Sequence, residues 1–256
     1  AGLVISQLGI EKTEGTFIVA AGISAALGLL SFALPNTPPK AAGTPSSMGA
    51  ILGKDAFVLL KNKSFLIFFI SAIAICIPLS FYYGFANSFL NEIGLDNAAG
   101  KMTMGQMSEA IFILAIPFLF NKIGVKNMLI FGISAWVLRY VCFAYGNMDA
   151  SWMLYAGIIL HGICYDFFFV TGYMYTEKKA GENIKNAAQG LFTFATYGVG
   201  MFIGTNYSGF VVEQNKLADA TGHNWTSIWL TPAAIAGAVL IAFILFFKEK
   251  KEVEAA

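Results

Sequence analysis

The chain has 256 residues, of which 57% are hydrophobic and only 12% are charged, and its mean hydropathy is +0.67. An average soluble domain carries about 25% charged residues, so this composition indicates a polytopic membrane protein and excludes an ordinary soluble domain. The net charge of +1 and the lack of a basic stripe give no sign of nucleic acid as a partner.

Seven apolar runs are long enough, or nearly so, to cross a hydrocarbon core of about 30 Å as helices, and they predict an all-α fold. In chain order they lie at 16–34, 64–89, 102–120, 127–145, 152–175, 187–212 and 226–247. The loops between most of them are short, so consecutive runs are expected to cross the lipid bilayer in alternating directions.

The lysines are distributed unequally between the two sides that such alternation defines. One side receives twelve lysines and the other receives three. The twelve are Lys40, Lys54, Lys61, Lys63, Lys122, Lys126, Lys178, Lys179, Lys185, Lys248, Lys250 and Lys251, and the three are Lys12, Lys101 and Lys216. The positive-inside rule makes the lysine-rich side cytoplasmic, which predicts a cytoplasmic C-terminus.

A long connector at 35–63 separates the first apolar run from the other six. It begins with PNTPPK, continues through AAGTPSS and ends in a stretch of hydrophobic residues among lysines, which suits a short helix at the membrane interface. An N-terminus outside the cell without a signal sequence is expected only if the chain is part of a longer protein. We therefore predict the last helix of an N-terminal half with its outer loop (1–34), a cytoplasmic interdomain linker (35–63) and a complete six-helix C-terminal domain with a short cytoplasmic tail (64–256), which is the arrangement of the major facilitator superfamily.

Several other classes of function have no support in the sequence. Cys76, Cys142 and Cys164 lie inside apolar runs without metal-ligand spacing, so we interpret them as small buried residues. The chain has no glycine-rich phosphate loop, no HExxH motif and no nucleophile elbow. We expect no metal, no cofactor and no enzymatic activity.

Four ionisable side chains lie inside the apolar runs: Glu109, Arg139, His161 and Asp166. A charge in hydrocarbon costs about 2.5 to 3.5 kcal/mol on insertion scales, so such residues usually face the interior of a bundle or a wet cavity. At about 1.5 Å of rise per residue, Glu109 lies roughly 10 Å from the outer end of its run and Arg139 roughly 18 Å from the inner end. These depths nearly coincide, His161 falls at a similar depth, and Asp166 lies a little over one turn deeper, which predicts one shared cavity near the midplane.

Helical spacing adds neighbours to these residues. Gln106 and Glu109 are three residues apart and share a helix face, as do His161 and Tyr165, which are four apart. An amide, a carboxylate, an imidazole and a phenol are therefore expected to converge from two helices.

Alternative interpretations stay open for some of these residues. Arg139 is equally well explained as a structural counter-ion for a carboxylate, whereas for His161 a functional role is favoured over that of a core histidine. Tyr82 and Tyr83 fit either a binding role or an interfacial aromatic belt. For Glu109 and Asp166 the functional interpretation is favoured over a structural one.

Six segments, in order, resemble the nucleoside:proton symporter family of the major facilitator superfamily, and the similarity covers nearly the whole chain. They are FALPNTPPK, DAFVLLKNKSFLIFF, MGQMSEAIFILAIPFLFNKIGVKNML, AWVLRYVCFAYG, YDFFFVTGYMY and NAAQGLF. The resemblance implies proton-coupled import of nucleosides across the cell inner membrane. It also implies nucleosides, protons and the absent N-terminal half as partners.

The resemblance also assigns roles to residues. It implies that Gln106 and Glu109 contact the nucleoside, that Tyr165 stacks near it and that Asp166 belongs to the coupling network. The sequence departs from the family around Ser80 and Tyr83, where amide-bearing residues are expected, and at His161, where an aromatic residue is expected. The predicted substrate-binding residues are Gln106, Glu109, Tyr165, His161, Tyr83 and Ser80, and the predicted proton-coupling residues are Asp166, Glu109 and Arg139.

The chemistry of these residues agrees with that assignment. A nucleoside needs flat aromatic faces and a few hydrogen-bonding groups, and proton symport needs a buried carboxylate that can load and release a proton. Arg139 can pair directly with only one carboxylate, and Glu109 lies level with it, so Asp166 is favoured as the proton carrier. A sugar or other small-metabolite symporter of the same fold and a non-transporting membrane ligand sensor are the competing functions.

Overall fold

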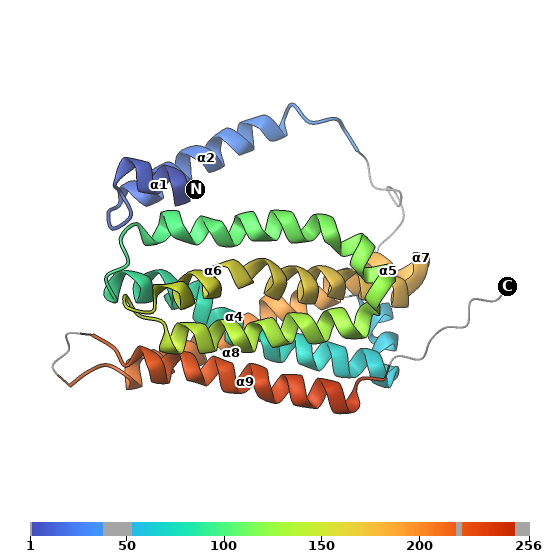
Figure 1. Ribbon diagram of the computed structural model, residues 1–256. Coiled ribbons are helices and arrows are strands. Elements are labelled where there is room, and N and C mark those ends of the chain that lie inside the picture. Colours follow the sequence, from blue (N-terminus) through green and yellow to red (C-terminus); the bar gives the residue numbers. More distant parts are fainter. Residues whose placement is uncertain (1, 38–52, 219–221, 249–256) are drawn as a thin grey trace.

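The computed structural model describes residues 2–37, 53–218 and 222–248, and within these ranges the regular structure consists of helices joined by turns and loops, with one isolated β-bridge between Lys216 and His223. The helices in chain order are α1 (Gly2–Leu8), α2 (Gly15–Ser31), the 3-10 helix η1 (Lys54–Lys61), α4 (Lys63–Glu92), α5 (Ala98–Tyr145), α6 (Ser151–Tyr165), the π-helical η2 (Asp166–Val170), α7 (Thr171–Thr193), the π-helical η3 (Phe194–Gly200), α8 (Met201–Gln214) and α9 (Trp225–Phe246). Figure 1 shows α4 to α9 side by side as a bundle.

Two long helical stretches turn back on themselves at a glycine. Helix α5 has 48 residues, which at 1.5 Å per residue would span about 72 Å, more than twice the core of a bilayer. It turns at Gly124, whose φ of 76° and ψ of 161° are open to glycine and costly for other residues. Gly181, with φ of 66°, plays the same part inside α7. Each glycine therefore divides one stretch into two spans (Figure 1).

These turns reconcile the helices with the seven predicted runs. Four continuous stretches are long and apolar enough to cross a membrane: Lys63–Glu92, Ala98–Tyr145, Ser151–Gln214 and Trp225–Phe246. Because two of them turn back, they contain the six runs predicted after the connector. The run predicted at 16–34 is the shorter α2, which has 17 residues and ends at Ser31. Its helix stops early because the chain passes through turns ahead of Pro35, and a proline disfavours helix at the residue before it.

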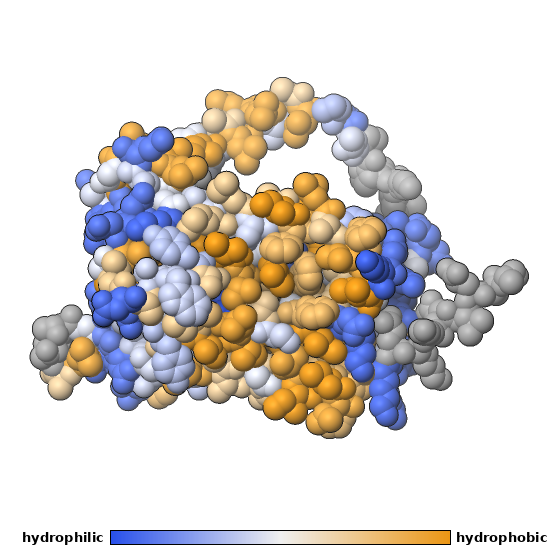
Figure 2. Space-filling view, in the orientation of Figure 1, coloured by the Kyte–Doolittle hydropathy of each residue, from blue (hydrophilic) through white to orange (hydrophobic). Residues whose placement is uncertain are grey.

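The surface of the bundle has the polarity expected of a membrane protein. Figure 2 shows hydrophobic side chains gathered over the middle of one face and hydrophilic side chains at both ends. The turns at Gly124 and Gly181 carry Lys122, Lys126 and Lys185, and they lie at the same end of the bundle as the end of α9 (Figure 1). The lysine-rich loops are thus at one end, as the alternation of spans requires.

Aromatic rings make up much of the core between the spans. Phe68 of α4 stacks on Phe192 of α7 at 5.3 Å between ring centroids, and Tyr140 of α5 stacks on Trp229 of α9 at 5.7 Å. In lipid, where water does not drive helices together, packing of this kind is a main source of association. The rings fix α4, α5, α7 and α9 relative to one another and so determine where the polar side chains lie.

The two N-terminal helices differ in how they meet this bundle. Helix α2 has no buried residue and lies outside the bundle in Figure 1, whereas α1 packs against the start of α5. Between them, a carboxylate oxygen of Glu11 accepts hydrogen bonds from Asn87 Nδ2 (2.9 Å), Asn91 Nδ2 (3.0 Å) and the backbone N–H of Ala99 (3.0 Å). Partial burial opposes ionisation of Glu11, but these hydrogen bonds and nearby Lys12 outweigh it and hold the pKa below its ordinary value.

Part of the predicted connector is visible. The expected short helix is present as η1, which packs against α7 and exposes Phe57 and Val58. Residues 38–52 of the connector and residues 249–256 of the predicted tail lie outside the described residues.

Candidate functional site

Close contact between α5 and α6 brings the polar residues of the site together. The hydroxyl of Ser108 accepts a hydrogen bond from the backbone N–H of Gly162 (3.0 Å) and lies 2.7 Å from the carbonyl oxygen of Ile159. A Cβ atom on Gly162 would lie 2.6 Å from the backbone nitrogen of Glu109, so only glycine allows this approach. Glu109 directly follows Ser108 in the sequence, and His161 directly precedes Gly162. The contact between Ser108 and Gly162 therefore holds the side chains of Glu109 and His161 close to each other.

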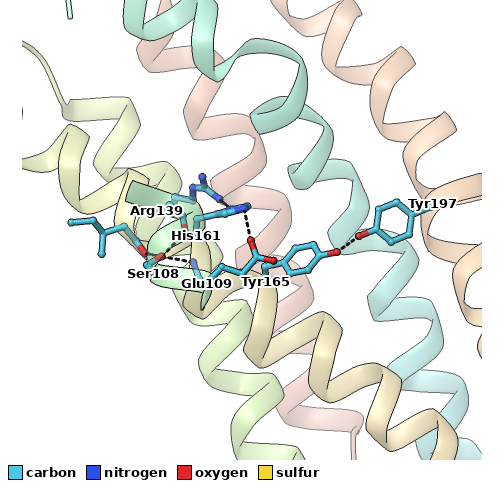
Figure 3. Close-up of polar contacts among 9 residues, drawn as sticks. Ser108, Glu109, Arg139, His161, Tyr165 and Tyr197 are labelled. Carbon is cyan, nitrogen blue, oxygen red and sulfur yellow. Dashed lines mark hydrogen bonds and ion pairs between the residues drawn. The ribbon is translucent and has the colours of Figure 1, made fainter. Parts of the chain in front are cut away.

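Arg139, His161 and Glu109 form a polar chain from the core of the bundle to its surface (Figure 3). The fully buried Arg139 has its Nη1 atom 2.9 Å from Nδ1 of His161. A guanidinium is always protonated and only donates, so Nδ1 accepts and the neutral ring carries its proton on Nε2. That Nε2 atom lies 3.7 Å from Oε2 of Glu109. The histidine therefore directs a proton towards the carboxylate of Glu109.

This chain differs from the direct ion pair expected between Arg139 and Glu109. Among the described residues, no carboxylate oxygen lies within ion-pair distance of the guanidinium, because His161 stands between the two groups. The charge of Arg139 is instead covered by Tyr82, whose ring centroid lies 3.5 Å from the guanidinium carbon. His161 also stacks on Tyr82, at 5.1 Å between ring centroids. A cation over an aromatic face is stabilised by the ring quadrupole, which makes Tyr82 part of the site.

Asp166 lies in a different environment. It is fully buried, and within the described ranges neither of its carboxylate oxygens has a hydrogen-bond partner. It is also the first residue of η2, and π-helical turns occur frequently at functional sites. A buried carboxylate without a partner is costly when charged and much less so when it carries a proton.

Four of the predicted binding residues lie along one open face of the bundle. Tyr83 is 50% exposed, Gln106 is exposed, and Glu109 and Tyr165 are half-buried. The Tyr83 side chain is within electrostatic range of Glu109 and Tyr165. A second phenol, Tyr197 of η3, places its hydroxyl 2.5 Å from that of Tyr165 (Figure 3). The face thus combines aromatic rings with an amide, a carboxylate and hydroxyl groups.

Ser80 is the one predicted binding residue that lies away from this face. It is buried, and its hydroxyl donates to the carbonyl oxygen of Cys76 at 2.9 Å. A Cβ atom on Gly204 would lie 2.3 Å from the same hydroxyl, so Ser80 packs against α8. Successive residues of an α-helix point in directions about 100° apart, so Ser80 and Tyr83, three residues apart, differ in direction by about 60°. That difference is enough to bury Ser80 and expose Tyr83.

Sequence reasoning missed Tyr197. It lies in the predicted run at 187–212, which contains none of the four ionisable residues that pointed to the site. The only signal for it was a hydroxyl-bearing ring in the middle of an apolar span, where a polar group needs a partner.

The bundle and its polar chain define the class of the protein. Helical stretches that each reverse at a glycine, charged residues buried inside the bundle and an open polar face are features of a secondary transporter. The comparisons make this specific: the chain belongs to the nucleoside H⁺ symporter family, whose model matches residues 2–252.

Two curated relatives from Escherichia coli cover almost the whole chain. The putative nucleoside transporter YegT is 38% identical over 96% of this chain and 59% of its own length. The nucleoside permease NupG is 34% identical over 96% of this chain and 62% of its own length. The chain therefore spans about three fifths of the length of these relatives.

A solved structure agrees with the fold. The crystal structure of an aspartate-to-alanine variant of NupG matches with a TM-score of 0.86 and 32% identity, covering 96% of this chain and 64% of that chain. The predicted family and the predicted all-α, major facilitator-type fold are confirmed. The family consists of transporters and not enzymes, as expected.

Proposed function

We propose that this chain carries the substrate- and proton-handling half of a proton-coupled nucleoside importer. The observation that supports this most strongly is the position of Glu109, which is half-buried at the open face and lies next to Nε2 of His161. One carboxylate is thus in reach of both a ligand on the face and a fixed proton donor. A nucleoside, with its aromatic base and its hydroxyls, matches the aromatic and polar groups of that face.

In this proposal the open face meets the other half of the transporter. Residues 1–34 include the last helix of the N-terminal half, residues 35–63 form the linker and residues 64–256 form the C-terminal domain with its tail. The absence of any buried residue in α2 supports the assignment, since a membrane helix without buried residues needs contacts from elsewhere. The protein would lie in the cell inner membrane with the lysine-rich end in the cytoplasm.

The two carboxylates have different environments and so suit different roles. Glu109 reaches the face, and its Oε2 lies 3.7 Å from Nε2 of His161, whose N–H favours the ionised carboxylate, so ligand binding and the charge of Glu109 are linked. Asp166 has no partner among the described residues, which favours its neutral form and suits a site that loads a proton. We assign Asp166 as the proton carrier, Glu109 mainly to binding, and Arg139 to holding His161 in its tautomer.

Transport by the full-length protein in proteoliposomes tests the proposal. Radiolabelled uridine and adenosine should accumulate against their gradients only when an inward proton gradient is imposed. Competition by excess unlabelled glucose would favour a sugar symporter, and binding of nucleoside without any flux would favour a sensor. A reporter enzyme fused at the C-terminus should be active only if it functions in the cytoplasm, and periplasmic activity would reverse the orientation.

A further inference from the structure

The hydroxyls of Tyr165 and Tyr197 form a pair that is not part of the polar chain of Arg139, His161 and Glu109 and, within the described ranges, does not hydrogen-bond to Asp166. Their oxygens are 2.5 Å apart, and they come from the end of α6 and from η3, two segments separated by the turn at Gly181. Tyr197 is 37% exposed and Tyr165 is half-buried, so the pair lies at the open face. Figure 3 shows Tyr165 beside Glu109, within the proposed nucleoside site.

The pair keeps unused hydrogen-bonding capacity. A phenol has one proton to donate and can also accept. When one hydroxyl donates to the other, the accepting hydroxyl still has its own proton, and the donating oxygen still has lone pairs. The pair therefore presents one donor and one acceptor, side by side and at a fixed separation.

Packing holds the two rings in place. The ring of Tyr165 lies 5.3 Å from that of Phe169, and the ring of Tyr197 lies 6.2 Å from it, so one buried phenylalanine supports both. Further along the same helices, the hydroxyl of Tyr173 lies 3.0 Å from that of Thr193. The pair is thus a fixed element that needs little ordering when a ligand binds.

We propose that the Tyr165–Tyr197 pair recognises the vicinal diol of the ribose, a role that rests on the proposed nucleoside function. The 2′- and 3′-hydroxyls of a ribonucleoside lie on neighbouring carbons, at a separation close to that of hydrogen-bonded oxygens. One of them can accept from the free phenolic proton while the other donates to the second phenol. A deoxyribose lacks one of these hydroxyls and leaves one phenol without its partner. The pair therefore determines specificity for ribonucleosides over 2′-deoxyribonucleosides.

The test compares uptake of radiolabelled uridine and 2′-deoxyuridine by the full-length protein. The wild type should prefer uridine in transport efficiency, and Tyr197→Phe, which removes only the hydroxyl, should lower that preference about two- to tenfold. Tyr173→Phe is the matched control, because it removes a bridging phenol along the same helices and should leave the preference unchanged. Combining Tyr165→Phe with Tyr197→Phe should lower the preference little further than either change alone, since the two hydroxyls act as a unit.

The outcomes separate this inference from the function on which it rests. A wild type that transports uridine and 2′-deoxyuridine equally well, or a Tyr197→Phe variant that transports with an unchanged preference, would overturn the diol assignment and leave nucleoside transport standing. Absence of any nucleoside uptake by the wild type would instead remove the proposed function. Should Tyr197→Phe fail to fold, competition on the wild type decides: 2′-deoxyuridine and 3′-deoxyuridine should each compete more weakly than uridine, and equal competition would refute the inference.

Discussion

The contact that holds the segment between α1 and α2 onto the bundle depends on one carboxylate, so Glu11→Ala should release it. In the structure Glu11 accepts three hydrogen bonds, from Asn87, Asn91 and the backbone of Ala99. A hydrogen bond to a charged group contributes about 1.5 to 3 kcal/mol, but this carboxylate is partly exposed and water competes for it. At about 1 kcal/mol for each bond, the loss is about 3 kcal/mol, or roughly a hundredfold in the ratio of docked to undocked segment.

Hydrogen exchange of the full-length protein in nanodiscs measures this ratio. The amide of Ala99 donates to Glu11, so peptides covering the start of α5 should exchange up to roughly a hundredfold faster in Glu11→Ala. Glu14 is the matched control: it lies in the same loop, is exposed and makes no side-chain capping hydrogen bond, so Glu14→Ala should exchange like the wild type. Equal exchange in the two variants would refute the reasoning.

The same contact should depend on pH. The pKa of Glu11 is lower in the docked segment than that of a free carboxylate. Glu11 therefore stabilises the docked segment fully above the ordinary carboxylate pKa, and this stabilisation is lost as the pH falls through the lowered pKa. The protection of the Ala99 amide, which is its exchange rate relative to the intrinsic rate at the same pH, should therefore fall in acid in the wild type. In Glu11→Gln, whose neutral amide oxygen still accepts, this protection should not change over that range, and an acid response of equal size there would point to another group.

Three further predictions concern the site, all in the full-length protein. Asp166→Asn should abolish accumulation of nucleoside against its gradient while allowing exchange down the gradient, whereas Glu109→Gln should mainly weaken binding. The opposite pattern would reverse the roles of the two residues. Full accumulation in both variants would show that neither carboxylate couples transport to protons. Gln106→Ala should weaken nucleoside binding between twofold and just over tenfold, as expected for one lost hydrogen bond to a neutral group, and unchanged affinity in a folded variant would take Gln106 out of the site. Gly162→Ala should force α5 and α6 apart at a cost of about 1 to 3 kcal/mol, and so lower both thermal stability and uptake. Gly190→Ala is the control, because its added Cβ meets no atom within 4 Å and should lower neither. Equal melting temperatures of the two variants would show that the close approach of α5 and α6 is not needed.

The helices and the depth of the charged residues were largely predictable from the sequence. Apolar runs of membrane length located the spans, and the rise per residue placed Arg139, His161 and Glu109 at one level, where the structure brings His161 to 2.9 Å from Arg139 and 3.7 Å from Glu109. Depth gives height along the membrane normal and not direction around a helix axis. The order Arg139–His161–Glu109 and the burial of Ser80 depend on that direction, so neither was predicted.

Other features were beyond the reach of hydrophobic patterns. Short loops were predicted between the runs, but the backbone that reverses the chain was not: the left-handed φ of Gly124 and of Gly181 divides each stretch into two helices. The pairing of Tyr165 with Tyr197 joins two helices at a distance of 32 residues along the chain, and no single-helix periodicity contains it.

The π-helical segment at Asp166–Val170 has a consequence for reading mutational data on this protein. A π turn holds about one more residue than an α turn, so side chains after it are rotated by about 100° relative to a regular helix. A scan of substitutions should show tolerated and sensitive positions in one phase up to Tyr165 and in a displaced phase beyond Thr171. Deleting one residue from the segment would let it close as an ordinary α turn and leave the later side chains facing as they do now, whereas deleting one residue from the α-helical part of the span would rotate every later side chain by about 100°.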